Sequence, residues 1–183
     1  VIREAVAGGI PDRLATLRAE ATTTTSALRA KLRGDLHSHS DWSDGTTSIA
    51  SMAETATWLG HDYLVLTDHS PRLRVANGLT AERLRDQLKV VAEFDALLSG
   101  IEVDILDDGC LDQVPELLER LDIVVASVHS KLKMEKGEMT ARMLAAVANP
   151  QTNVLGHITG RLVAGSRGTR PGPSFDADAV VAA

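Results

Sequence analysis

The chain has 183 residues, of which 44% are hydrophobic, and this length and composition suit a globular domain with a substantial core. The formal net charge of −6 disfavours a generally nucleic-acid-binding surface, although a local basic patch would be enough for such binding. Cys110 is the single cysteine, which excludes an internal disulfide, and no apolar run reaches the length of a membrane span. We therefore expect a cytoplasmic protein without a membrane partner.

The first 32 residues differ in pattern from the remainder. Residues 1–20 read as two short helices separated by a double-glycine break. Four consecutive threonines at 22–25 are poor helix formers and are typical of a linker. We expect a short helical segment with its linker over residues 1–32 and a separate domain over residues 33–183.

From residue 33 onward, short apolar or β-branched runs alternate with longer stretches of helical periodicity. Such alternation predicts parallel strands covered by helices, hence an α/β layer or barrel. The predicted strands are residues 33–39, 62–69, 100–106, 122–129 and 153–160, and the predicted helices are residues 48–60, 80–98, 113–121 and 138–149. Thr80 suits the N-cap of the second helix. Residues 164–174 predict a long loop, and residues 176–183 the start of a further element.

Most of the histidines fall at the carboxyl ends of predicted strands. In a parallel α/β fold these ends meet on one face, where sites are built. His61 is the exception, because it lies at a turn between a helix and a strand, and Glu102 lies within the third strand. A single histidine in such a position is more often a core or loop residue, but five equivalent positions favour one shared site. The five are His37, His39, His69, His129 and His157.

The stretch DLHSHSDWSDG, residues 35–45, has the pattern of a metal-binding strand end. Alternate residues of a strand point to the same face, so the two histidines can bind one ion. Imidazole is the commonest metal ligand, and imidazoles mixed with carboxylates favour Zn, Mn or Fe over Ca or Mg. Asp44 is a candidate oxygen ligand. Asp35 and Asp68 are candidate hydrogen-bond partners for imidazole N–H groups, and a purely structural role suits both equally well.

Five motifs in order, DLHSHSDWSDG, LTDHS, GIEVDIL, ASVHSK and GHITGR, resemble those of the PHP (polymerase and histidinol phosphatase) superfamily over about residues 33–163. The subtype is similar to the PHP module at the C-terminus of bacterial family X DNA polymerases and to its free-standing relatives. This resemblance implies a distorted, TIM-like β/α barrel of seven strands. It also implies up to three divalent metal ions at the strand ends and metal-dependent hydrolysis of phosphoesters.

The resemblance assigns seven residues as metal ligands in three groups. The first metal takes His37 and His39, Glu102 bridges the first and second metals, the second also takes His129 and His157, and the third takes Asp44 and His69. The expected catalytic set is His37, His39, Glu102, His129 and Lys131.

Three cations are candidates for binding the phosphate of the substrate. Lys131 directly follows the VHS motif and is expected to neutralise phosphate charge. Arg74 and Arg161 are weaker candidates, and for all three a solvated surface cation is the alternative.

Two departures from the family pattern stand out. The final Asp-x-His motif is not present before Ala183, so we expect the C-terminal part of the domain to be missing. The connection between the helix predicted to end near Leu98 and the strand GIEVDIL also looks shorter than is usual in the family.

Residues 1–18 are similar to the second half of a helix-hairpin-helix unit, of the kind that binds nucleic-acid backbones. Two packing helices without a DNA role fit nearly as well.

These features predict a phosphoesterase that acts at nucleic-acid 3' ends, as a 3'-5' exonuclease or a 3'-phosphatase, with DNA as a candidate partner. Two alternatives stay open. One is a small-molecule phosphatase of the histidinol-phosphatase type, and the other is a structural PHP module with little catalysis.

Overall fold

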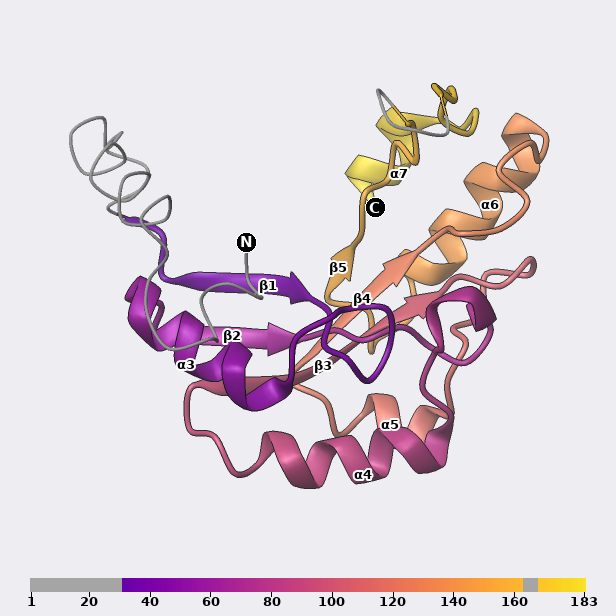
Figure 1. The fold of residues 1–183 in the computed structure, drawn as a ribbon. Coiled ribbons are helices and arrows are strands. Elements are labelled where there is room, and N and C mark those ends of the chain that lie inside the picture. Colours follow the sequence, from indigo (N-terminus) through magenta and orange to yellow (C-terminus); the bar gives the residue numbers. More distant parts are fainter. Residues whose placement is uncertain (1–30, 163–167) are drawn as a thin grey trace.

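The computed structural model describes residues 31–162 and 168–183, and its centre is one curled sheet of parallel strands (Figure 1). The strands are β1 (Gly34–Ser38), β2 (Tyr63–Leu66), β3 (Leu97–Asp104), β4 (Ile123–Ser127) and β5 (Val154–Leu155). Their order in the sheet is the order of the chain, and every neighbouring pair is parallel. Sequential parallel strands joined by crossovers form the wall of a barrel, and here they make about half of one. The predicted α/β class is confirmed.

Capping side chains fix where the main helices begin. Ser48 accepts a hydrogen bond from the Ser51 amide before α3, and Thr80 accepts one from the Arg83 amide before α4, as predicted. Gly60 ends α3 in the left-handed conformation, with a φ of 75°. The helices are α3 (Ile49–Leu59), η2 (Arg74–Ala76), α4 (Ala81–Val91), α5 (Pro115–Leu118), α6 (Lys136–Val147) and α7 (Ala177–Ala182). None of these described helices has the length and apolar character that crossing a membrane requires.

The prediction of one helix over residues 80–98 was wrong at its C-terminal end. The helix α4 stops at Val91, and Leu97 and Leu98 already belong to β3. The spacing of the leucines extended the predicted helical pattern beyond Val91, but Leu97 packs in the core beneath the sheet. The connection that looked short is a tight turn over residues 92–96.

The last strand is shorter than the predicted 153–160, because β5 contains only Val154 and Leu155. Residues 176–183 do begin a further element, since α7 packs on α6 through Val180 and Met143. The helical segment predicted for residues 1–32 lies outside the described residues except for its last two positions, and so does part of the predicted 164–174 loop.

Alternation along β3 separates the core from the face that carries polar groups. Ile101 and Val103 are buried in the main apolar cluster with side chains from α4, α5 and β4. Each such burial contributes about 1.5–3 kcal/mol to stability. Glu102 and Asp104 are also buried, and because side chains alternate they point to the opposite face. The strand that anchors the core therefore places two carboxylates inside the curl of the sheet.

Candidate metal centre

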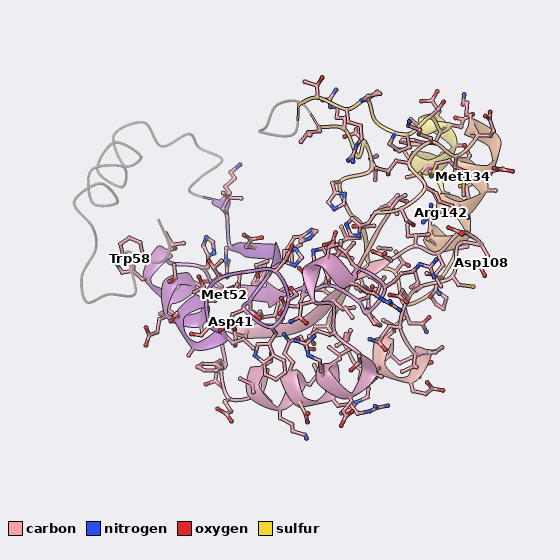
Figure 2. All side chains as sticks on the ribbon, turned by 45° about the vertical axis from the view of Figure 1, so that its right-hand side comes forward. Asp41, Met52, Trp58, Asp108, Met134 and Arg142 are labelled. Atoms are coloured by element: carbon pink, nitrogen blue, oxygen red, sulfur yellow. The ribbon has the colours of Figure 1, made fainter. Side chains whose placement is uncertain are left out.

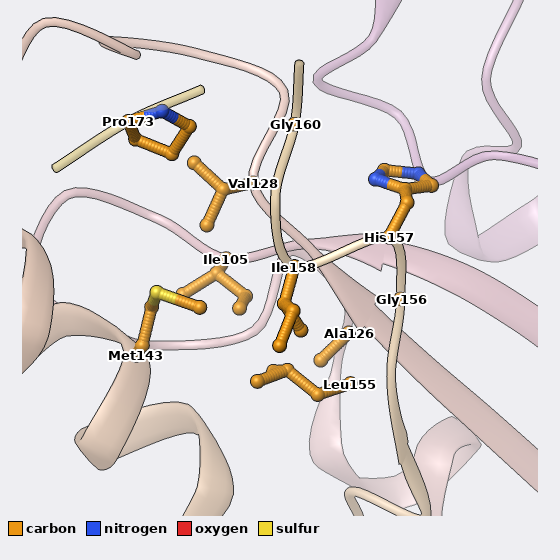
Figure 3. Close-up of a pocket in the computed structure, with 10 residues that line it drawn as sticks. All are labelled: Ile105, Ala126, Val128, Met143, Leu155, Gly156, His157, Ile158, Gly160 and Pro173. Atoms are coloured by element: carbon orange, nitrogen blue, oxygen red, sulfur yellow. The ribbon is translucent and has the colours of Figure 1, made fainter. Parts of the chain in front are cut away.

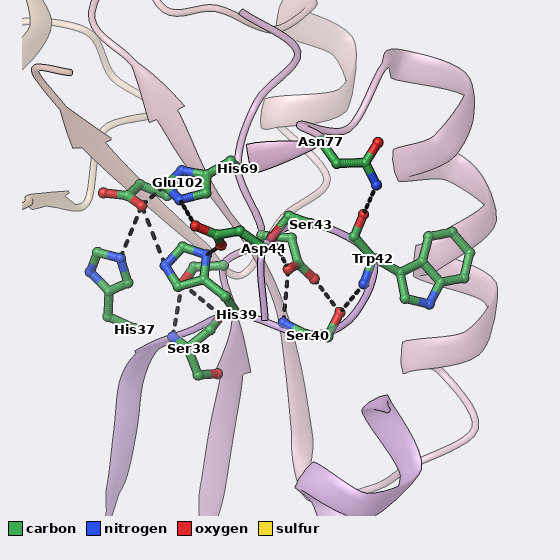
Figure 4. Close-up of polar contacts among 12 residues, drawn as sticks. His37, Ser38, His39, Ser40, Trp42, Ser43, Asp44, His69, Asn77 and Glu102 are labelled. Carbon is green, nitrogen blue, oxygen red and sulfur yellow. Dashed lines mark hydrogen bonds and ion pairs between the residues drawn. The ribbon is translucent and has the colours of Figure 1, made fainter. Parts of the chain in front are cut away.

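Glu102 lies at the centre of a cluster that contains all five predicted strand-end histidines. Its side chain is 1% exposed. Carboxylate Oε2 lies 3.2 Å from His37 Nε2, 3.4 Å from His39 Nε2 and 3.1 Å from His69 Nδ1 (Figure 4). Carboxylate Oε1 lies 3.3 Å from His129 Nε2 and 2.8 Å from His157 Nε2. The convergence inferred from the strand-end positions is therefore present in the structure.

The two histidines of the HxH motif reach Glu102 because β1 is pinned to β2 at the residue between them. Ser38 donates its backbone N–H to Thr67 Oγ1 at 2.9 Å, and its hydroxyl donates to the Val65 carbonyl at 2.6 Å. His37 and His39 therefore share the other face of the strand, and their ring centroids are 5.1 Å apart.

Asp68 supports the turn after β1 rather than an imidazole. Its buried carboxylate accepts hydrogen bonds from the Ser40 amide at 2.8 Å, the Ser40 hydroxyl at 2.6 Å, the Ser43 hydroxyl and Gln87 Nε2 at 2.5 Å. Of the two roles left open for Asp68, the contacts match the structural one. Its effect on the site is indirect, because this turn carries Asp44.

Asp44 stands between two of the histidines. Its Oδ2 lies 3.5 Å from His69 Nε2 and its Oδ1 lies 3.8 Å from His39 Nδ1 (Figure 4). The loop is held from its other side at the Trp42 carbonyl, which accepts hydrogen bonds from Asn77 Nδ2 and the Arg83 guanidinium. The loop thus presents a carboxylate at a fixed place beside two imidazoles.

The exposed Asp35 also contacts the backbone instead of a ring. Its Oδ1 accepts the His37 amide at 3.0 Å. Of the two roles left open for Asp35, this backbone contact matches the structural one.

Asp104 is the functional residue that the sequence analysis missed. It is 2% exposed, and its Oδ1 lies 2.5 Å from His129 Nδ1. The signal that could have found it is the period of two along β3, because Asp104 follows Glu102 on the same face. This bond fixes the tautomer with hydrogen on Nδ1 and leaves Nε2 free for a ligand.

His157 reaches the cluster because the chain bends sharply after β5. Its φ is 20°, and Gly156 lies so close to the Ser127 side chain that a Cβ there would clash. Figure 3 shows the His157 ring directed away from the apolar group that includes Val128 and Ile158. The short β5 therefore acts as an anchor from which the imidazole is turned back toward Glu102.

The charges of the cluster depend on one another. Burial by itself raises the pKa of Glu102, but hydrogen bonds from His129, His157 and His37 outweigh it and hold that pKa well below its usual range. The hydrogen bond to Glu102 raises the pKa of His37. Burial lowers the pKa of His39 and that of His69, which favours neutral rings that can bind metal.

The residues present fit divalent metal ions. The Nδ1 atoms of His39 and His69 are buried and make no hydrogen bond to the described residues, although Glu102 Oε2 lies 3.1 Å from His69 Nδ1. Buried nitrogens without a hydrogen bond are costly unless a ligand satisfies them. Three overlapping groups hold their donor atoms within 4.8 Å of one another: His37, His39 and Glu102; His39, Asp44 and His69; and His69, Glu102 and His129.

The predicted phosphate-binding cations lie at the edge of the site or away from it. Lys131 is 60% exposed, and its Nζ lies 2.5 Å from Asp107 Oδ2. Together with His129 it lines an open cleft. Arg74 and Arg161 are exposed, and the described contacts link neither of them to the histidine cluster.

Comparison with known proteins agrees with this geometry. The PHP domain family matches residues 35–172. The DNA polymerase/3'-5' exonuclease PolX of Bacillus subtilis (strain 168) is 43% identical over 157 residues, which cover 82% of this chain and 27% of that protein. A probable phosphatase of Thermoanaerobacter sp. (strain X514) is 32% identical over 132 residues, covering 69% of this chain and 54% of that protein. One of Acetivibrio thermocellus is 32% identical over 130 residues, covering 67% and 53%. The chain thus spans about a quarter of PolX and about half of each phosphatase.

Proposed function

The chain belongs to the PHP domain family, as its motifs predicted, and from this premise we propose that it is a metal-dependent phosphoesterase. The observation that carries the proposal is the contact of five imidazole rings with the single buried carboxylate of Glu102. A carboxylate whose two oxygens face separate groups of nitrogen donors suits a bridge between metal ions. Bound there, divalent ions would generate hydroxide near neutral pH and neutralise charge on a phosphate.

We assign the ligands in the groups that the resemblance implied. The shared feature is the short separation of the donor atoms, and the assignment is His37, His39 and Glu102 for one ion, Glu102, His129 and His157 for a second, and Asp44 and His69 for a third. Five imidazoles with two carboxylates suit Zn, Mn or Fe.

The chain's own residues position these donors and the substrate. Asp104 accepts a hydrogen bond from His129 Nδ1–H and directs Nε2 into the site. Lys131 lies beside His129 at the cleft, where its ammonium would hold a phosphate oxygen. Arg161 and Arg74 remain candidates for further phosphate contacts.

We also propose that the curled sheet is part of a seven-stranded, TIM-like barrel built on residues 33–183, with residues 1–32 as a separate helical segment. The support is the sequential parallel order of β1 to β5, which is the order of strands in a barrel wall.

For the substrate, we propose phosphoesters at nucleic-acid 3' ends, cleaved as by a 3'-5' exonuclease or a 3'-phosphatase. The support is the relative named as a DNA polymerase/3'-5' exonuclease, which is the most similar of those described above. The matches to probable phosphatases favour the alternative, a small-molecule phosphatase of the histidinol-phosphatase type.

A hydrolysis assay with Mn²⁺ separates these possibilities. It would compare a 3'-recessed oligonucleotide, a 3'-phosphorylated oligonucleotide and histidinol phosphate, with Glu102→Gln as the inactive control. We expect the wild-type chain to hydrolyse an oligonucleotide substrate and the Glu102→Gln variant to lose this activity. Turnover of histidinol phosphate alone would establish the alternative, and no turnover of any substrate would indicate a structural module.

A further inference from the structure

An open cleft of about 620 Å³ lies directly beside the histidine cluster, between the loop that follows β4 and residues 170–174. His129 lines the cleft and also contacts Glu102, so the cleft is continuous with the proposed metal centre. Met134, another lining residue, lies at the end of the molecule that carries α6 and α7, far from Trp58 (Figure 2). We call this open cleft the basic cleft. Its charged lining residues are Lys131, Lys133, Glu135, Lys136 and Arg170.

The charge of the basic cleft is opposite to that of the chain. Four cations and one carboxylate give its lining an excess of three positive charges, whereas the chain carries −6. Lys131 is paired with Asp107, and Arg170 donates a hydrogen bond to the Gly160 carbonyl. Within residues 31–162 and 168–183, the ammonium groups of Lys133 and Lys136 have no ion-pair partner. A local positive field in an acidic protein attracts an anion to that place.

The number of cations exceeds what one phosphate group needs. A phosphate monoester carries a charge of about −1.5 to −2 near neutral pH. Metal ions at Glu102 together with Lys131 would already neutralise it. Lys133, Lys136 and Arg170 are then left for negative charge farther along the same ligand, which a nucleic-acid strand supplies at every nucleotide.

We propose that the basic cleft binds successive phosphates of a nucleic-acid strand whose terminal phosphoester lies at the metal centre. The proposal rests on the proposed function and adds where the strand runs and which residues recognise it. Lys133 and Lys136 would then give the enzyme its preference for an oligonucleotide over a mononucleotide, through binding of phosphates that do not react.

Strand binding can be measured without turnover, by fluorescence anisotropy of a short labelled oligothymidylate with phosphorothioate linkages. The informative variant is Lys133→Ala/Lys136→Ala. The matched control, Arg85→Ala/Arg120→Ala, removes two exposed charges on α4 and after α5, on the side of the molecule away from α6 and α7 (Figure 1). Metal content and thermal midpoint would establish that each variant is folded.

We expect the cleft variant to reduce the slope of log affinity against log salt by about 1.4, since each single-strand phosphate contact contributes about 0.7. Between about 50 and 200 mM salt, the wild-type chain should then lose about sevenfold more affinity than the variant. An unchanged slope, an equal change in the control, or equally tight binding of oligoglutamate would overturn the proposal. A chain that shows the expected slopes but hydrolyses no phosphoester would confirm the cleft and refute the proposed function.

Discussion

Replacing Asp104 with asparagine tests how the proposed metal centre controls the protonation of His129. Burial by itself lowers the pKa of His129, but hydrogen bonds with Asp104 and Glu102 outweigh it and raise that pKa to about 9 in the metal-free protein. The difference from the ordinary value of 6.5 corresponds to roughly 3 kcal/mol in favour of the imidazolium. Asp104→Asn keeps the shape and a hydrogen-bond acceptor but removes the charge, so this pKa should fall.

The effect on stability has a defined sign. A raised folded-state pKa stabilises the fold below pH 6.5, and this contribution is lost as the pH rises through about 9. We therefore expect Asp104→Asn to lower the free energy of unfolding of the metal-free protein by about 1–3 kcal/mol near pH 6. Near pH 10 the effect should be much smaller, because His129 is neutral there in both proteins. Urea unfolding with a chelator present, at the two pH values, measures the difference.

The same proton competes with a metal ion for His129, because a ligand imidazole must be neutral. Metal binding near pH 8 should therefore release a proton from His129 in the wild-type protein and fewer protons in Asp104→Asn. Calorimetric titration with Mn²⁺ or Zn²⁺ in two buffers of different ionisation enthalpy counts these protons, and Asp86→Asn on the exposed face of α4 is the control. Equal proton release in all three proteins, or an equal loss of stability at both pH values, would refute the reasoning.

Three further variants test the remaining assignments. His37→Ala/His39→Ala should abolish phosphoester hydrolysis and lower the metal content measured by elemental analysis, while the circular-dichroism spectrum stays unchanged. Undiminished activity would show that these histidines do not form the active site. Lys131→Ala should keep its metal but lose roughly tenfold to a hundredfold in kcat/KM, since a charge-assisted hydrogen bond contributes about 1.5–3 kcal/mol; unchanged kinetics would make Lys131 an ordinary surface cation. Gly156→Ala should lower the free energy of unfolding by about 1–3 kcal/mol because its Cβ meets packed side chains of β4. Gly137→Ala, which faces open space, should not destabilise the protein in the same denaturation assay, and equal losses would contradict the packing argument.

The sequence was sufficient to bring the histidines and Glu102 together because their positions follow from two regular features. Parallel strands end at one edge, and side chains alternate along each strand. From these two features alone, His69, His129 and Glu102 are predicted to lie close together, and the structure shows that they do. The α3 boundaries were predictable for a similar reason, because Ser48 and Gly60 satisfy the helix ends locally.

Other features depend on tertiary contacts and could not be read from the chain. Leucine suits both a helix and a buried strand, so only packing decides that Leu97 belongs to β3. Asp68 looked like a partner for His69, but its bonds run to Ser40 and Gln87, which are distant in sequence. Adjacency in the chain was the misleading criterion in that case, and the same criterion hid Asp104.

The central position of β3 explains why one carboxylate can serve the whole site. Strands β1 and β2 lie on one side of β3, and β4 and β5 lie on the other. The oxygens of Glu102 divide in the same way, because Oε2 faces the histidines of β1 and β2 whereas Oε1 faces those of β4 and β5. A glutamate on an edge strand would have neighbours on one side only. The proposed bridging role therefore follows from strand order, and we expect Glu102→Gln, which replaces one of the two oxygens with an amide nitrogen, to deprive one half of the site of its shared carboxylate oxygen.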